Sequence, residues 1–78
     1  MQKKSVQLMG HQTSVSLEPV FWEALALIAR HQNTSIRQLI MQVDTQPDRL
    51  PNLSAALRIF VLYHKDDFQL ADLPSYQK

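Results

Sequence analysis

The segment Thr13–Leu17 alternates polar and apolar side chains and reads as one short strand. In this alternation Val15 and Leu17 share one face, and Ser14 and Ser16 share the other. A lone strand leaves its backbone N–H and C=O groups unpaired, and by itself it cannot bury its apolar face. A fold that contains this strand must therefore supply a second strand, either from the same chain or from another copy.

Two sources for that second strand are visible. A second alternating run covers residues 5–9, with Val6 and Leu8 on one side, and Gly10, the only glycine of the chain, separates it from the first run. The two runs can form a β-hairpin, or they can form one continuous extended arm. In the second case the strand pairs antiparallel with its twin in a homodimer, about a two-fold axis.

A helix is predicted directly after the strand. Pro19 cannot donate a ladder hydrogen bond, but it suits the first turn of a helix, where its amide has no partner in any case. Apolar residues then recur at spacings of three and four, which is typical of a helix with one buried face. Asn33 can adopt the left-handed backbone conformation that commonly ends a helix. The stripe consists of Phe21, Ala24, Leu25, Ile28 and Ala29.

Two further helices follow. Ser35 and Gln38 have the spacing of a capping box, which predicts a second helix with Ile36, Leu39, Ile40 and Val43 on its buried face. Two prolines in the segment 44–51 interrupt that helix and predict a loop. Asn52 can cap a third helix. Beyond Lys65 the sequence has no clear period and reads as a tail.

Length and composition favour a dimer. A chain of 78 residues buries a small core, and without cysteine it has no disulfide to compensate. The three histidines and the scattered carboxylates show no metal-ligand spacing, so neither a metal nor another cofactor is expected. The absence of cysteine and of an apolar signal core favours a cytoplasmic protein, and no apolar run approaches the ~20 residues needed to span a membrane.

The net charge of the chain is small, but its charged residues are distributed unevenly between the two halves. The net charge is +1, which by itself argues little for a nucleic-acid partner. Residues 1–37 carry four basic side chains against two glutamates, whereas residues 38–78 carry five aspartates against four basic side chains. Contacts with a polyanion are therefore expected in the N-terminal half.

The order of these elements resembles the ribbon-helix-helix superfamily, whose members include β-ribbon readers of the DNA major groove. The resemblance lies in the strand and proline of residues 13–19, the helical stripe of residues 21–29, and Asn33-Thr-Ser-Ile-Arg-Gln-Leu-Ile40. With Phe21-Trp22 and residues 52–61 included, the whole chain is similar to a bacterial subfamily of short ribbon-helix-helix proteins that are presumed to bind DNA.

The resemblance implies roles for individual residues. Gln12, Ser14 and Ser16 would read base edges in the major groove, where glutamine can pair with adenine through two hydrogen bonds. In the family an arginine often stands at the position of Gln12, so recognition of guanine there is in doubt. The start of the second helix would hold a DNA phosphate against the positive end of the helix dipole. The phosphate-binding candidates are Ser35, Ile36, Arg37, Lys3 and Lys4.

The predicted architecture is mainly α with a short β ribbon: a β-α-α ribbon-helix-helix domain in an intertwined homodimer, with an additional C-terminal helix. Residues 1–10 form an arm or a first hairpin strand, 11–46 the core, 52–65 the third helix and 66–78 the tail. The predicted dimer core consists of Val15, Leu17, Phe21, Leu25, Ile28, Ile36, Leu39 and Ile40.

The function predicted from this architecture is sequence-specific binding of double-stranded DNA in transcription regulation. The alternative is an antitoxin or adaptor that captures a protein partner with its tail, and the candidate anchors are Phe68, Leu70, Leu73 and Tyr76. An enzyme is not expected, because the chain lacks a glycine-rich phosphate loop and any recognisable arrangement of nucleophile and base.

Overall fold

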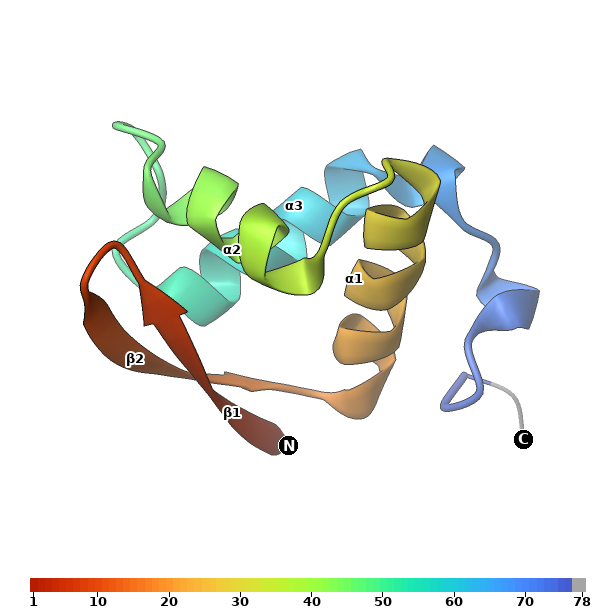
Figure 1. Ribbon diagram of the computed structural model, residues 1–78. Helices are drawn as coiled ribbons and strands as arrows, with labels where there is room; N and C mark the ends of the chain where they lie inside the picture. The colour runs from red at the N-terminus through yellow and green to blue at the C-terminus, as the bar shows by residue number, and fades with distance from the viewer. Residues whose placement is uncertain (77–78) are drawn as a thin grey trace.

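The computed structural model describes residues 1–76, which form a β-hairpin followed by three helices (Figure 1). The strands are β1 (Gln2–Leu8) and β2 (His11–Leu17). The helices are α1 (Pro19–His31), α2 (Ile36–Asp44) and α3 (Leu53–Tyr63). Two short 3₁₀ turns, Lys65–Asp67 and Leu70–Asp72, follow α3. The β-α-α order with an additional C-terminal helix is the predicted one.

Of the two arrangements open at the sequence level, the structure forms the hairpin. β1 pairs antiparallel with β2 from Gln2 opposite Leu17 to Leu8 opposite His11. The connection is the two-residue turn Met9-Gly10, with φ of 41° and 86°. Positive φ at both positions is what a type I′ turn requires, and this turn matches the natural twist of paired strands.

The hairpin corrects one step of the sequence argument. In the predicted intertwined homodimer, β2 pairs with its twin, so a second copy is needed to pair β2 and to bury its apolar residues. In the structure β1 supplies the pairing, and Val15 and Leu17 are both 0% exposed within one chain. The expectation was wrong because it treated β2 as the only certain strand, whereas the alternation upstream of Gly10 forms a strand of equal length.

The helix boundaries agree with the sequence signals. Pro19 opens α1, and Asn33 has a φ of 60° just beyond its end. The Oγ of Ser35 accepts a hydrogen bond from the amide of Gln38 at 3.1 Å at the start of α2. In the same way, Asn52 Oδ1 accepts one from Ala55 at 3.2 Å at the start of α3. These side chains satisfy amides that the first helical turn leaves without partners.

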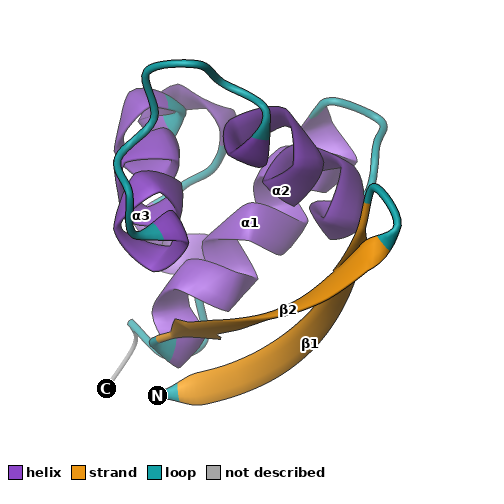
Figure 2. Ribbon diagram, turned by 90° about the vertical axis from the view of Figure 1, so that its left-hand side faces the viewer, coloured by secondary structure: helices purple, strands orange, loops and turns teal. Residues whose placement is uncertain are grey.

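The helices all lie on one face of the hairpin, and the other face is open (Figure 2). In this arrangement α2 packs against β1, whereas α3 and α1 pack against β2. The core between the layers contains the apolar residues predicted for the strand and the helices. Its fully buried large side chains are Leu8, Val15, Leu17, Leu25, Ile28, Leu39, Ile40, Leu57 and Leu73.

The segment after α3 is packed against the helices, although its sequence shows no period. Leu73 is 2% exposed and belongs to the core. Asp67 accepts a hydrogen bond from Gln32 at 3.3 Å and lies 3.6 Å from the His31 ring nitrogen. The amide of Ser75 donates to Glu23 at 2.9 Å. The prediction of a tail was therefore incomplete, because short 3₁₀ turns can bury a single leucine without producing a periodic stripe.

Candidate nucleic-acid interface

The open face of the hairpin is polar and without acidic residues. Because side chains alternate along each strand and paired residues share a face, the register defines this outer ribbon face. Its side chains are exposed except that of Ser16, which is partly buried beside the buried Leu17. The face consists of Lys3, Ser5, Gln7, Gln12, Ser14 and Ser16.

The predicted base-reading residues therefore share one face, and the structure adds two neighbours from β1. Ser5 lies opposite Ser14, and Gln7 lies opposite Gln12. Neither was selected from the sequence. Their alternation with Val6 and Leu8 indicated that Ser5 and Gln7 share one side of their strand. Only the hairpin register shows that this side is also the side of Gln12 and Ser14.

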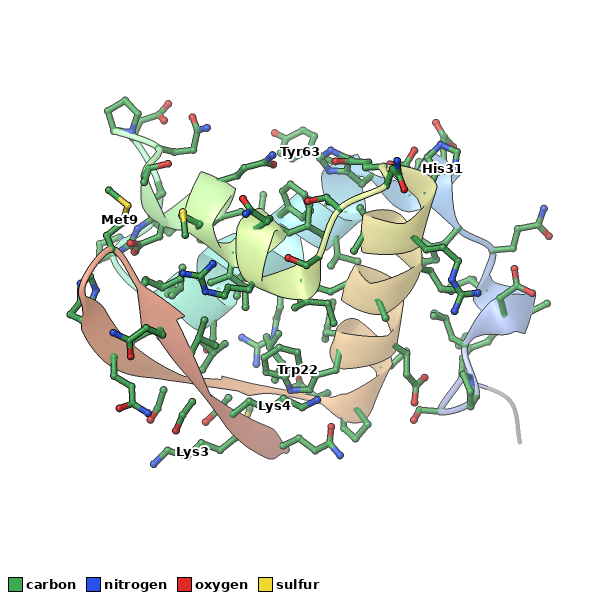
Figure 3. The ribbon with its side chains drawn as sticks, in the orientation of Figure 1. Lys3, Lys4, Met9, Trp22, His31 and Tyr63 are labelled. Carbon is green, nitrogen blue, oxygen red and sulfur yellow. The ribbon has the colours of Figure 1, made fainter. Side chains whose placement is uncertain are left out.

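The two adjacent lysines point to opposite sides of the ribbon (Figure 3). Lys3 lies on the outer ribbon face, opposite Ser16. Lys4 lies on the inner side, where its Nζ is 5.0 Å from the centre of the Trp22 ring, at a distance typical of a cation–π interaction. Both lysines were predicted from the sequence as phosphate contacts, but only Lys3 shares the face of the serines.

The N-terminus of α2 lies beside β1. The Nε of Arg37 donates to the carbonyl of Gln7 at 2.9 Å, which joins the first turn of α2 to the ribbon. A shallow groove of about 250 Å³ lies between them and is lined in part by Lys4, Trp22 and Arg37. No carboxylate lines this groove. The two cations and the positive end of the helix dipole make this side of the ribbon favourable for an anion.

The two edges of the ribbon differ. Two carbonyls of β1 accept side-chain hydrogen bonds from the helices: Trp22 Nε1 donates to Gln2 at 3.0 Å, and Arg37 Nε donates to Gln7. Within residues 1–76, the β2 residues His11–Leu17 form no hydrogen bond outside the hairpin. An unpaired strand edge is a template for another strand, so β2 is the more open edge of this sheet.

An ion pair fixes the end of the ribbon to α3. Arg58 donates to both carboxylate oxygens of Glu18, at 3.1 and 3.3 Å, and its guanidinium carbon lies 5.7 Å from the centre of the Phe21 ring. The pKa of Glu18 is held below its usual range by hydrogen bonding to its own backbone amide and by Arg58. Burial opposes this shift but does not outweigh it. Glu18 therefore stays ionised where β2 passes into α1.

The residues predicted as a dimer core lie in the core of a single chain. Val15, Leu17, Leu25, Ile28, Leu39 and Ile40 are at most 1% exposed, and Phe21 and Ile36 are partly buried. A dimer that keeps this chain fold gains nothing by covering the six buried side chains. Their role at a dimer interface stays a prediction, and it requires the hairpin to open.

The four tail anchors of the alternative prediction are not equally accessible. Leu73 is buried and Phe68 is packed against the core, whereas Leu70 and Tyr76 are 52% and 55% exposed. The segment from Phe68 to Tyr76 is part of the folded domain, so it does not extend from the domain as a free arm. Residues 77 and 78 of the predicted tail lie outside the described residues.

Within residues 1–76, no three histidine or carboxylate side chains gather as a metal-binding group. Among the helices of the same residues, none combines the length and apolar character needed to cross a bilayer.

A short antiparallel ribbon with an open polar face, backed by a capped helix pair, defines the class of β-ribbon DNA-binding folds. The sequence comparison agrees: the family model of the ribbon-helix-helix domain matches residues 1–65, and the chain belongs to this family. Domains of this family generally bind DNA as dimers and are not enzymes. Searches of curated proteins and of solved structures found no match.

Proposed function

We propose that this protein is a sequence-specific DNA-binding homodimer that regulates transcription by placing its β ribbon in the major groove. The observation that carries the proposal is the outer ribbon face. It is polar, it has a lysine and no carboxylate, and the helices leave it open. A groove lined by phosphates favours such a surface, because each carboxylate would add repulsion.

Gln12, Ser14 and Ser16 are the proposed base readers. They lie along β2, and their side chains share one face. Glutamine can donate to and accept from adenine, and serine can form hydrogen bonds with several base edges. A good bidentate contact contributes about 1–3 kcal/mol of discrimination against a wrong base pair. In a homodimer each contact occurs twice, which favours a palindromic operator.

The dimer is proposed to form through the free edge of β2. Pairing β2 with β2 of a second copy places these two strands at the centre of a four-stranded sheet, with one β1 on each side. Neighbouring strands lie about 4.8 Å apart, so the two β1 strands are about 14 Å apart. The major groove is about 12 Å wide. The central pair therefore enters the groove, and each β1 lies over its rim, where Lys3 reaches phosphates.

Selection of bound sequences from random duplex DNA at 100 mM salt tests the proposal. We expect recovery of a short palindrome. Changing both Ser14 and Ser16 to alanine should weaken preference for that palindrome over scrambled duplex while the fold is kept. Ser54→Ala on α3, outside the outer ribbon face, is the matched control and should leave the preference unchanged. Recovery of no enriched sequence, together with no duplex binding at 50 mM salt, would refute the proposal.

A further inference from the structure

The groove between β1 and the first turn of α2, here called the β1–α2 groove, has an apolar floor. Trp22 and Ile40 line it and are only 5% and 1% exposed. Val6 and Ile36, which are partly buried, also line it. The groove therefore offers an apolar surface that the polar outer ribbon face does not offer.

Two cations line the same groove. Lys4 and Arg37 are both exposed, and the remaining lining residues, Ser5 and Gln7, are uncharged. Within residues 1–76, Nζ of Lys4 forms no hydrogen bond or ion pair, although it lies 5.0 Å from the centre of the Trp22 ring (Figure 3). Arg37 uses its Nε for the carbonyl of Gln7, and its two terminal nitrogens have no partner among the same residues. Both cations therefore have donors left for a ligand.

The lack of a carboxylate partner distinguishes these two cations from arginines elsewhere in the fold. Arg49 and Arg58 each lie within 3.1 Å of a carboxylate oxygen. By contrast, Lys4 and Arg37 line one groove of about 250 Å³ that has no acidic residue among its described lining. Like charges near each other repel, so an anion held between these two lowers the electrostatic energy of the groove.

We propose that the β1–α2 groove binds a small amphipathic carboxylate, which is one carboxylate group on a compact apolar body. The terminal nitrogens of Arg37 can hold both carboxylate oxygens, and Lys4 adds a second positive charge. The apolar body then covers Trp22 and Ile40. Ligand sites are typically apolar cavities of about 300–1,000 Å³ in which a few polar groups fix the orientation. This groove is at the small end of that range, which favours a body of one ring.

Other ligands use only part of this groove. Inorganic phosphate or a DNA phosphate can contact Lys4 and Arg37, but it leaves the apolar floor in water. An uncharged apolar molecule covers the floor but leaves both cations without a partner. No lining residue of the groove belongs to β2, so the proposed pairing of two β2 strands uses a different edge of the ribbon.

Titration of the isotope-labelled full chain, followed by two-dimensional NMR without DNA, tests the site. Benzoate carries both a ring and a carboxylate, benzyl alcohol has the ring without the charge, and acetate has the charge without the ring. Benzoate should shift the indole N–H resonance of Trp22, the only tryptophan, and the amide resonances of Ile36 and Arg37. Its dissociation constant should be at least about tenfold lower than that of either other probe.

Substitution of each cation gives a second test. Lys4→Gln and Arg37→Gln should each raise the benzoate dissociation constant at least about fivefold, because each removes a charged donor. Lys3→Gln is the matched control, since Lys3 is the neighbour of Lys4 but lies on the outer ribbon face; it should change the constant by less than about twofold. The amide spectra of the free variants report whether the fold is kept. Lys4→Gln removes no hydrogen bond within residues 1–76.

Three results would overturn the proposal. The first is benzyl alcohol or acetate binding as tightly as benzoate, which would mean that the charge or the ring contributes nothing. The second is an equal effect of Lys3→Gln and Lys4→Gln in folded variants. The third is a set of benzoate-induced shifts that omits Trp22 and Arg37.

The site itself does not depend on the proposed function, because the titration contains no DNA. One consequence does rest on the proposed function: Arg37 is also a candidate phosphate contact, so saturating benzoate should weaken duplex binding at least about threefold relative to the same concentration of acetate. A chain that binds benzoate but no duplex supports the site and refutes only the proposed function. A chain that binds its duplex but not benzoate overturns only the site.

Discussion

The opposite orientation of Lys3 and Lys4 provides a matched pair of substitutions. Both residues are lysines on β1, one position apart, but Lys3 lies on the outer ribbon face and Lys4 lies over Trp22. If DNA lies against the outer ribbon face, Lys3→Ala removes a phosphate contact from each copy. Lys4→Ala should remove no contact with DNA on that face, because the Lys4 side chain points into the groove beside Trp22.

The expected magnitude follows from counterion release. Each phosphate contact contributes about 0.9 to the slope of log K against log salt, so Lys3→Ala in a homodimer should lower the slope by about 1.8. Between 50 and 200 mM salt the wild-type affinity should then fall about twelvefold more than that of the variant. Loss of the cation–π contact in Lys4→Ala should instead cost about 0.5–1 kcal/mol of stability.

Fluorescence anisotropy with the selected duplex, measured at four or more salt concentrations, gives both slopes. Urea unfolding followed by the fluorescence of Trp22, the only tryptophan, gives the stabilities. Equal slopes for the two variants, or a larger change for Lys4→Ala, would show that DNA does not lie on the outer ribbon face. A change of about 0.9 for Lys3→Ala would indicate one bound chain in place of two.

Three further predictions concern stability. Leu73→Ala should destabilise the chain by about 2–5 kcal/mol in urea unfolding, whereas the exposed Leu70→Ala should change it by less than about 1 kcal/mol; equal effects would contradict the burial of the final segment. The folded pKa of Glu18 lies below its unfolded value, so its contribution is complete above the unfolded pKa and is lost as the pH falls through the folded pKa. Glu18→Gln should therefore reduce the acid sensitivity of stability, and an unchanged pH profile would exclude a role for the pair with Arg58. Gly10→Ala should cost about 1–2 kcal/mol, because φ at this position is +86° and alanine is strained there; an unchanged urea midpoint would mean that the turn adopts another geometry.

Local signals in the sequence were sufficient for the elements. Pro19 marked the start of α1, Ser35 and Asn52 marked the caps of α2 and α3, and Asn33 marked the left-handed end of α1. These features depend on neighbours within four residues, so a single sequence contains all the information they need. The alternation along β2 likewise indicated which of its side chains are buried, since a strand with one buried face has only two sides.

Contacts between residues far apart in the sequence could not be predicted from such local signals. The sequence allowed β2 to pair with β1 or with another copy, and only the folded chain shows that Leu8 lies opposite His11 and closes the hairpin. Nothing in the adjacent pair Lys3-Lys4 distinguishes a residue on the open face from one over Trp22, because the difference depends on the register and on where α1 packs.

Burial of Leu73 had no local signal at all, since it depends on a surface formed by helices far away in sequence. A periodic pattern reports that a segment has an apolar face, but it does not report which segment covers that face. The sequence by itself therefore determined the order of the main elements and the starts of the helices. The tertiary structure decided their partners: which strand pairs with β2, which lysine faces outward, and which side of α3 is left without cover.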